Sequence, residues 1–125
     1  MADVCLTTQE AEDTIVEANN YSALLLNLKR FEEAKSLLRK TLPVARRVLE
    51  EGNNLRIRIR WNYARVLYED DGATLDDLRE AVTTLEDTER TARRVLGGTH
   101  PVTKGIGGHL QAAQSALRAR ESGAS

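Results

Sequence analysis

The sequence contains one cysteine among 125 residues, and this scarcity excludes several classes of protein. An internal disulfide needs two cysteines, and a cysteine-rich zinc site needs more than one. The lone Cys5 is typical of a reducing compartment. The first residues also lack a basic stretch followed by an apolar core, which a secretory signal would need. We therefore expect a cytoplasmic location.

Long apolar runs, aromatic residues and an excess of either charge are missing as well. No run approaches the roughly 20 apolar residues of a membrane-spanning helix, so we expect no membrane partner. Aromatic residues make up 4% of the chain, so a core must consist mainly of aliphatic side chains. The net charge is -1, from 18 basic and 19 acidic residues, and gives no overall attraction toward nucleic acid or membrane surfaces.

Apolar residues recur at helical spacing along the chain, with one segment that imitates a strand. The stretch "LRIRIRW", residues 55–61, alternates apolar and basic residues as a β-strand with one charged face would. A lone strand would have no partner, because no second segment alternates in this way. Leu55, Ile59 and Tyr63 also keep the four-residue spacing of a helix. The sequence therefore predicts a helix over residues 55–69.

Two motifs occur twice and indicate an internal repeat. "ARRVL" at 45–49 recurs at 92–96, and "NNYS" at 19–22 resembles "WNYA" at 61–64. The second copy holds five extra residues between the two motifs, which we assign to the acidic segment "EDDGATLDD" at 69–77. Repeats of forty-odd residues are typical of stacked helix pairs that bury a shared core.

The repeats divide the chain into helical units. We expect one domain over 13–120, made of repeats at about 13–52 and 54–98 and a half repeat at 101–120. Residues 1–12 form a loose N-terminal segment in this interpretation, and 121–125 a frayed tail. Thr74 and Asp77 resemble a capping box, Gly97 ends a helix, and Pro101 suits a first helical turn. The predicted fold is all-α with five helices, a right-handed superhelical stack of antiparallel helix pairs.

The repeat motifs carry a family resemblance. "NNYSALLLNLKRFEEAKSLLRKTL" at 19–42 and "LGGTHP" at 96–101 resemble the tetratricopeptide repeat, in its kinesin-light-chain variety. That pattern runs from Asn-Asn-Leu-Ala to a closing Leu-Gly-x-x-His-Pro. The resemblance implies a non-enzymatic protein-interaction module. Such a module binds a peptide or a helix of its partner in the groove lined by the first helix of each repeat.

Position within the repeat implies which side chains line this groove. The second repeat would contribute arginines and aromatic residues, with asparagines as polar helpers. Arginine binds carboxylates through paired hydrogen bonds, so the partner would be acidic. The alternative is that the arginines pair with carboxylates such as those of 69–77, while Trp61 packs in the core. The predicted groove residues are Arg58, Trp61, Asn62, Arg65, Tyr68, Asn19 and Asn27.

The half repeat suggests a second function. Its single helix has no following helix to cover it, and its apolar stripe includes Val102, Ile106 and Leu110. A stack of helix pairs normally needs about three repeats, and this chain offers two and a half. The alternative hypothesis is therefore a homodimer that forms through these three residues.

The remaining charged segments carry no site. "RIRIRW" at 56–61 interleaves basic and aromatic residues, but no nucleic-acid recognition motif accompanies it, so we expect no nucleic-acid partner. The acidic segment 69–77 resembles a calcium loop only in charge. With Gly72 as the central glycine, Leu78 stands where the loop needs a glutamate.

The two histidines and the cysteine are too scattered to indicate catalysis. A cysteine nucleophile needs an adjacent histidine and a third group that orients it. Cys5, His100 and His109 fall in three different segments of the chain. We predict no enzymatic activity, no metal site and no cofactor.

Overall fold

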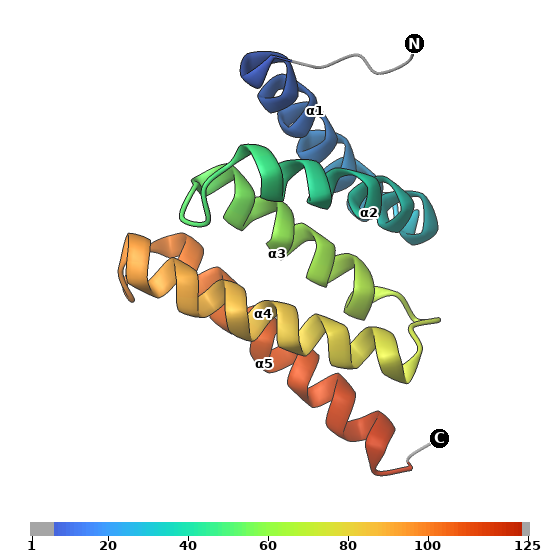
Figure 1. The fold of residues 1–125 in the computed structure, drawn as a ribbon. Coiled ribbons are helices and arrows are strands. Elements are labelled where there is room, and N and C mark those ends of the chain that lie inside the picture. The colour runs from blue at the N-terminus through green and yellow to red at the C-terminus, as the bar shows by residue number, and fades with distance from the viewer. Residues whose placement is uncertain (1–6, 124–125) are drawn as a thin grey trace.

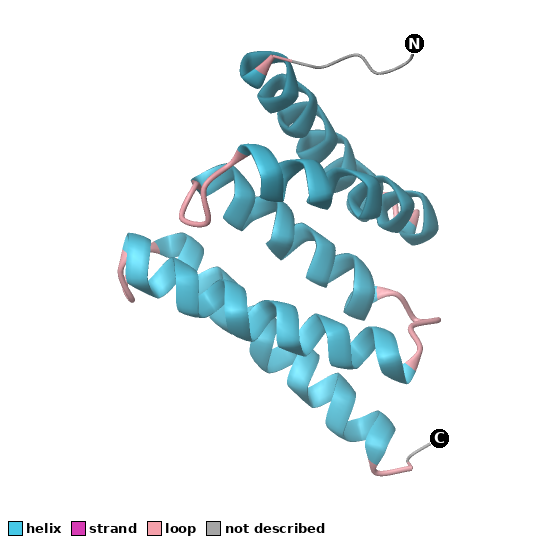
Figure 2. Ribbon diagram, in the orientation of Figure 1, coloured by secondary structure: helices cyan, strands magenta, loops and turns pink. Residues whose placement is uncertain are grey.

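The computed structural model describes residues 7–123, which form five helices joined by short loops (Figure 1). No strand occurs within that range, and residues 55–61 lie inside the third helix (Figure 2). The prediction of an all-α fold with five helices is confirmed. Cys5 lies outside the described residues. The helices are α1 (Thr8–Asn27), α2 (Phe31–Val48), α3 (Asn54–Glu69), α4 (Leu75–Leu96) and α5 (Pro101–Glu121).

A capping box fixes the start of α1. The Thr7 hydroxyl accepts a hydrogen bond from the Glu10 amide at 3.0 Å, and the Glu10 carboxylate accepts one from the Thr7 amide at 2.9 Å. These bonds satisfy amides that have no partner within the helix. Residues 8–12, which the repeat pattern placed in a loose segment, are therefore helical. The helix ends before Lys29, whose φ of 60° reverses the chain into α2.

The later helices begin and end where the sequence predicted. The Thr74 hydroxyl and the Asp77 carboxylate form the second capping box, at the start of α4. Gly97 ends α4 with a φ of 96°, a conformation that glycine adopts without steric cost. The His100 imidazole then caps α5 by accepting a hydrogen bond from the Val102 amide at 3.1 Å. The acidic segment 69–77 therefore runs from the last residue of α3 through the loop into the first turn of α4.

The helices stack in pairs, with α3 at the centre. α1 packs against α2, α3 against α4, and α5 against α4, while α3 contacts all four other helices. The first helices α1, α3 and α5 lie side by side, and α2 and α4 cover the opposite side (Figure 1). Within residues 7–123 the backbones of α2 and α4 do not come into contact. The result is the α-solenoid that the repeat pattern predicted.

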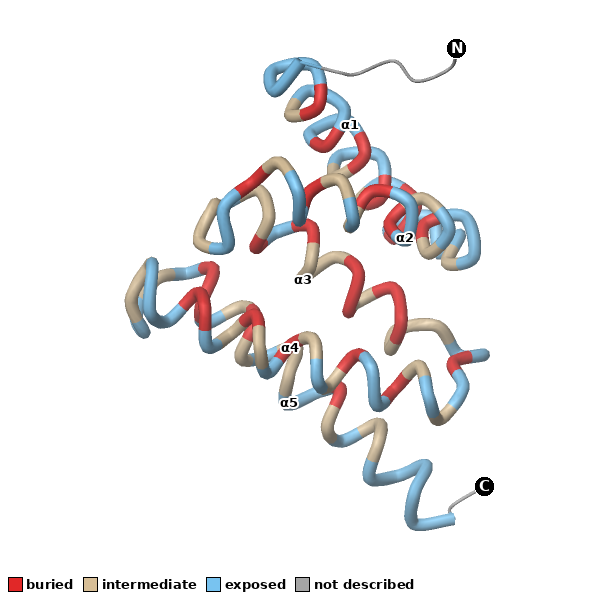
Figure 3. Tube along the Cα trace, viewed as in Figure 1, coloured by how far each residue is buried: buried red, intermediate tan, exposed pale blue. Residues whose placement is uncertain are grey.

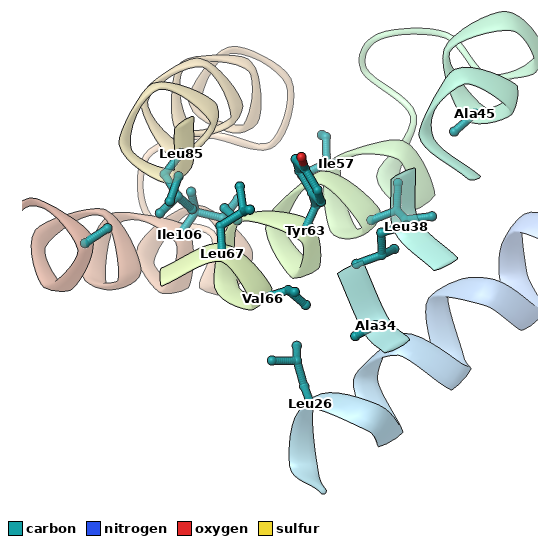
Figure 4. Close-up of a cluster of buried hydrophobic side chains, with 14 of the residues drawn as sticks. Leu26, Ala34, Leu38, Ala45, Ile57, Tyr63, Val66, Leu67, Leu85 and Ile106 are labelled. Atoms are coloured by element: carbon teal, nitrogen blue, oxygen red, sulfur yellow. The ribbon is translucent and has the colours of Figure 1, made fainter. Parts of the chain in front are cut away.

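The core runs through the whole stack between these layers (Figure 3). α3 buries side chains on both flanks, Ile59 and Val66 on one and Ile57 and Ala64 on the other. Figure 4 shows Leu38 of α2, Leu85 of α4 and Ile106 of α5 in the same cluster. A continuous core of this kind makes each helix depend on its neighbours.

No helix of residues 7–123 is both long enough and apolar enough to cross a bilayer.

Candidate partner-binding surfaces

The arginines of α3 lie on two opposite sides of the helix. Arg58 and Arg65, seven residues apart, lie on the side shared by α1, α3 and α5, which we call the α1–α3–α5 face. Arg56 and Arg60 lie on the other side, toward α2 and α4. Arg60 forms an ion pair with Asp87 of α4 at 2.6 Å, and the Arg56 guanidinium donates to the Leu49 carbonyl at 3.0 Å. The cluster that looks continuous in sequence therefore serves two surfaces.

An asparagine pair joins the first two repeats on the α1–α3–α5 face. The Asn62 amide donates to the side-chain oxygen of Asn19 at 2.7 Å, which links α3 to α1. Each side chain keeps further donors or acceptors that this bond does not use. Asn27 lies two helical turns beyond Asn19 and is exposed. The structure thus brings Asn19 and Asn62 together and leaves Asn27 apart from them.

Trp61 and Tyr68 face α5 and are only half-buried. The Trp61 ring lies over Gly105, where an added Cβ would stand 2.6 Å from Cη2 of the indole. The ring also makes an edge contact with His109, at 5.6 Å between centroids. The indole Nε1 is buried and has no hydrogen-bond partner within residues 7–123. Trp61 therefore packs α3 against α5, and this packing requires a glycine at 105.

A polar cluster adjoins that contact. The Tyr68 hydroxyl lies 2.5 Å from His109 Nδ1, Arg65 pairs with Glu69 at 2.7 Å, and Glu69 also lies 3.8 Å from His109. Burial, followed by the charge of Glu69, raises the pKa of Tyr68 to about 12. Burial, followed by the charge of Arg65, lowers the pKa of His109. The imidazole is therefore neutral at pH about 7, and the hydrogen bond joins two uncharged groups.

Arg58 differs from the other arginines of α3. Its side chain is exposed, and no carboxylate within residues 7–123 forms an ion pair with it. Arg65, by contrast, forms an ion pair with Glu69. Of the predicted groove cations, Arg58 is the one whose charge is open to an incoming partner.

The three residues predicted for self-association lie largely inside the fold. Val102 is 5% exposed and Ile106 is fully buried, because both pack into the core. Leu110 is partly buried against the same core. These side chains do not form an exposed surface in a chain that keeps α5 in place.

Sequence reasoning missed a cleft between α2 and α4. Because the backbones of these helices are not in contact and an ion pair of Lys35 with Asp77 at 3.3 Å joins them, α3 forms the floor of a cleft of about 440 Å³. At its centre the Tyr63 hydroxyl donates to Glu80 at 2.7 Å and accepts from Arg39 at 3.3 Å. Burial raises the pKa of Tyr63, and Arg60 lowers the pKa of Asp87. The lining residues are Arg39, Leu42, Pro43, Ala45, Arg46, Glu51, Arg56, Arg60, Tyr63, Glu80, Thr84 and Asp87.

We call this hollow the arginine cleft, after Arg39, Arg46, Arg56 and Arg60 in its lining. Helix periodicity alone could not predict it. Arg39 and Arg46 are seven residues apart and so share one side of α2, but many exposed helix sides carry such pairs. The cleft arises from the distance between α2 and α4, which local sequence does not encode. No group of His, Cys, Asp or Glu within residues 7–123 is arranged to hold a metal ion.

A comparison with family models identifies part of this arrangement. The model described as a tetratricopeptide repeat matches residues 18–55, from the middle of α1 through α2 to the start of α3. The match covers less than a third of the chain and supports a tetratricopeptide-type repeat over these residues. Comparisons with curated proteins and with solved structures gave no match. The kinesin-light-chain variety of the repeat stays a prediction, because the matched model does not distinguish it.

From the contact between Trp61 and Gly105 we predict how alanine substitution at two glycines of α5 changes the free energy of unfolding. Gly105→Ala should lower the free energy of unfolding by about 1–2 kcal/mol, because overpacking against the indole outweighs the gain in helix propensity. Gly108→Ala is the matched control, since a Cβ at 108 would meet no atom within 4 Å. It should raise the free energy of unfolding by about 0.5–1 kcal/mol. Urea denaturation of both variants checks this, and equal stabilisation by both would contradict the packing.

His109 makes a second prediction, on pH dependence. Its pKa is lowered from the ordinary value of 6.5 in the folded chain. As pH falls, His109 of the unfolded chain therefore takes up a proton before His109 of the folded chain does. The contribution of His109 to the free energy of unfolding is full above pH about 6.5 and is lost as the pH falls through the lowered pKa. His109→Gln should remove part of the stability loss between pH about 7.5 and about 5.5, measured by urea denaturation. His100→Gln should show the same loss of stability as the wild type, because His109 is still present. A His109→Gln variant with the wild-type pH dependence would refute this role.

Proposed function

We propose that this chain is a non-enzymatic protein-interaction module that binds an extended segment or a helix of its partner on the α1–α3–α5 face. Repeat stacks use extended surfaces of this kind to bind other proteins. The family match supports the interaction role, and the exposed polar face supports the location of the site. The lone Cys5 and the absence of any long apolar run support a cytoplasmic location as part of this proposal.

Arg58 is the observation that carries the choice of partner. Its exposed guanidinium has no carboxylate partner within residues 7–123, so a carboxylate of the partner can bind it through paired hydrogen bonds. The neighbouring Asn62 offers amide groups that suit a peptide backbone. Trp61 and Tyr68 contribute ring edges beside α5. Asn27 extends the polar surface along α1. These features favour an acidic peptide segment.

The alternative of a homodimer through Val102, Ile106 and Leu110 has little support from the geometry. Two of the three side chains already pack in the core of the same chain. A second copy would have to displace α5 from α4 before it could reach them. That exchange would give up the Trp61 contact and the Tyr68–His109 hydrogen bond.

The proposal predicts the effect of reversing the charge of Arg58. Peptides selected from a displayed random library on the wild-type chain should be enriched in Asp and Glu. Arg58→Glu should weaken their binding by about tenfold, or about 1.4 kcal/mol, because it replaces an attraction by a repulsion. Fluorescence anisotropy with labelled peptides measures this, and circular dichroism should show unchanged helicity.

Arg46→Glu is the matched control for this experiment. Arg46 is exposed on α2 and lines the arginine cleft on the opposite side of the stack. It should leave peptide binding unchanged. If Arg46→Glu weakens binding and Arg58→Glu does not, the partner occupies the cleft and the proposed face is wrong. Selected peptides without acidic enrichment would remove the acidic preference from the proposal.

A further inference from the structure

The arginine cleft holds cations that no carboxylate of the described chain pairs with. Its lining includes Arg39, Arg46, Arg56 and Arg60. Arg60 forms its ion pair with Asp87 at 2.6 Å. Within residues 7–123, none of the other three arginines forms an ion pair with a carboxylate. The cleft therefore keeps positive charge that a ligand can use.

Two of the unpaired arginines stand level with one another at one end of the cleft. α2 and α3 run antiparallel (Figure 1), so Arg39 of α2 bonds to Tyr63 of α3, and Arg56 bonds to the Leu49 carbonyl. Arg46 comes seven residues after Arg39 along α2, and Arg56 comes seven residues before Tyr63 along α3. Both therefore lie about 10 Å along the stack from the contact of Arg39 with Tyr63. Arg46 is exposed on the wall of the cleft, and Arg56 is half-buried in its floor.

The carboxylates at this end of the cleft bond to other arginines. Asp87 accepts hydrogen bonds from Arg60 at 2.6 Å and from Arg90 at 3.1 Å. The hydrogen bond from Arg60 is the main reason why the pKa of Asp87 is lowered. Glu51 lies 3.8 Å from Arg94. Neither carboxylate is left to balance the two level arginines.

Arg39, at the other end, has a counter-charge close by. The Tyr63 hydroxyl accepts a hydrogen bond from Arg39 and donates one to Glu80 at 2.7 Å. The phenol therefore bridges a cation and an anion, and Glu80 offsets the charge of Arg39. The positive charge without a counter-charge in the cleft belongs to Arg46 and Arg56.

The size of the cleft limits what can enter it. The Lys35–Asp77 ion pair joins α2 to α4 beyond Arg39, and the Glu51–Arg94 contact bridges the loop after α2 to α4 at the opposite end. Between these bridges the cleft has a volume of about 440 Å³. That volume suits a small molecule, and the bridges obstruct a peptide chain that would run along the cleft.

We propose that the arginine cleft binds a small organic phosphate monoester, with its phosphate between Arg46 and Arg56. A phosphate monoester carries about two negative charges at pH about 7, which match the two unpaired guanidiniums. Arginine binds phosphate oxygens through paired hydrogen bonds, and Arg56 keeps donors that its bond to the Leu49 carbonyl does not use. Leu42 and Pro43 line the same cleft and offer apolar contact to the organic part.

The test is a titration of the ¹⁵N-labelled chain with phenyl phosphate, followed by the NMR shifts of backbone amides and arginine side chains. Shifts should saturate and should centre on Arg46 and Arg56. Benzoate should bind at least about tenfold more weakly, because it has one negative charge and two oxygens. Shifts that do not saturate, or that centre outside the cleft, would overturn the proposal. So would equal affinity for benzoate.

Arg46→Glu tests the site itself. It should weaken the binding of phenyl phosphate by at least about tenfold, because it replaces one of the two cations by an anion. Circular dichroism should be unchanged, since the side chain is exposed and forms no ion pair within residues 7–123. Arg47→Glu is the matched control, because Arg47 is the exposed neighbour on α2 and does not line the cleft. It should bind within about twofold of the wild type. Equal weakening by both variants would show a response to net charge alone and would overturn the site.

Two comparisons separate this site from the partner proposed for the α1–α3–α5 face. Arg58→Glu should leave the binding of phenyl phosphate unchanged, so failure of the acidic-peptide experiment would leave the cleft proposal intact. A phosphoserine peptide should bind more weakly than phenyl phosphate, because the bridges at both ends obstruct its chain. A phosphoserine peptide that binds more tightly, and loses that binding in Arg46→Glu, would overturn the choice of a small molecule as the ligand.

Discussion

The structure depends on the burial of α3 between its neighbours. A single helix pair leaves one apolar side uncovered, so each pair needs a further helix against it. α3 meets this need on both flanks, since it contacts α1, α2, α4 and α5. The apolar residues of α3 pack toward these four helices. Two narrow stretches of its surface remain for polar side chains, one on the α1–α3–α5 face and one toward α2 and α4. Those two stretches hold the arginines, so the burial of α3 determines where its charges lie.

Whether an arginine already has a carboxylate partner within the chain determines whether its charge can bind a ligand. Arg60 and Arg65 have carboxylate partners within the chain, which leaves little of their charge for a ligand. Arg58 has none within residues 7–123 and is exposed. A segment rich in arginine is therefore a poor guide to a binding site until the internal pairs are known. The same argument applies to the cleft, where Arg39 is occupied by the Tyr63 hydroxyl.

The two ends of the stack also differ for a physical reason. α5 shows polar residues on its free side and so ends the stack in a surface that water solvates. α1 shows Tyr21, Leu24 and Leu28 on its free side, where apolar area remains in contact with water. The described part of the stack therefore ends in a polar surface at α5 and in a partly apolar surface at α1.

The sequence by itself determined the helices, because helix periodicity, capping and chain reversal are local. Thr74 with Asp77, Gly97 and Pro101 each marked a helix end through interactions within a few residues. The same local reasoning placed 55–61 in a helix once no partner strand could be found. The early start of α1 was missed, although the Thr7–Glu10 capping box is equally local.

Only the tertiary structure decided which side chains are available. Val102 and Ile106 read as an uncovered stripe in sequence, yet α5 buries them against its neighbours. The pairing of Asn19 with Asn62, and of Tyr68 with His109, joins residues more than forty positions apart. The arginine cleft exists because α2 and α4 stand apart. Burial and charge pairing depend on distances between helices, and periodicity along one helix carries no information about those distances.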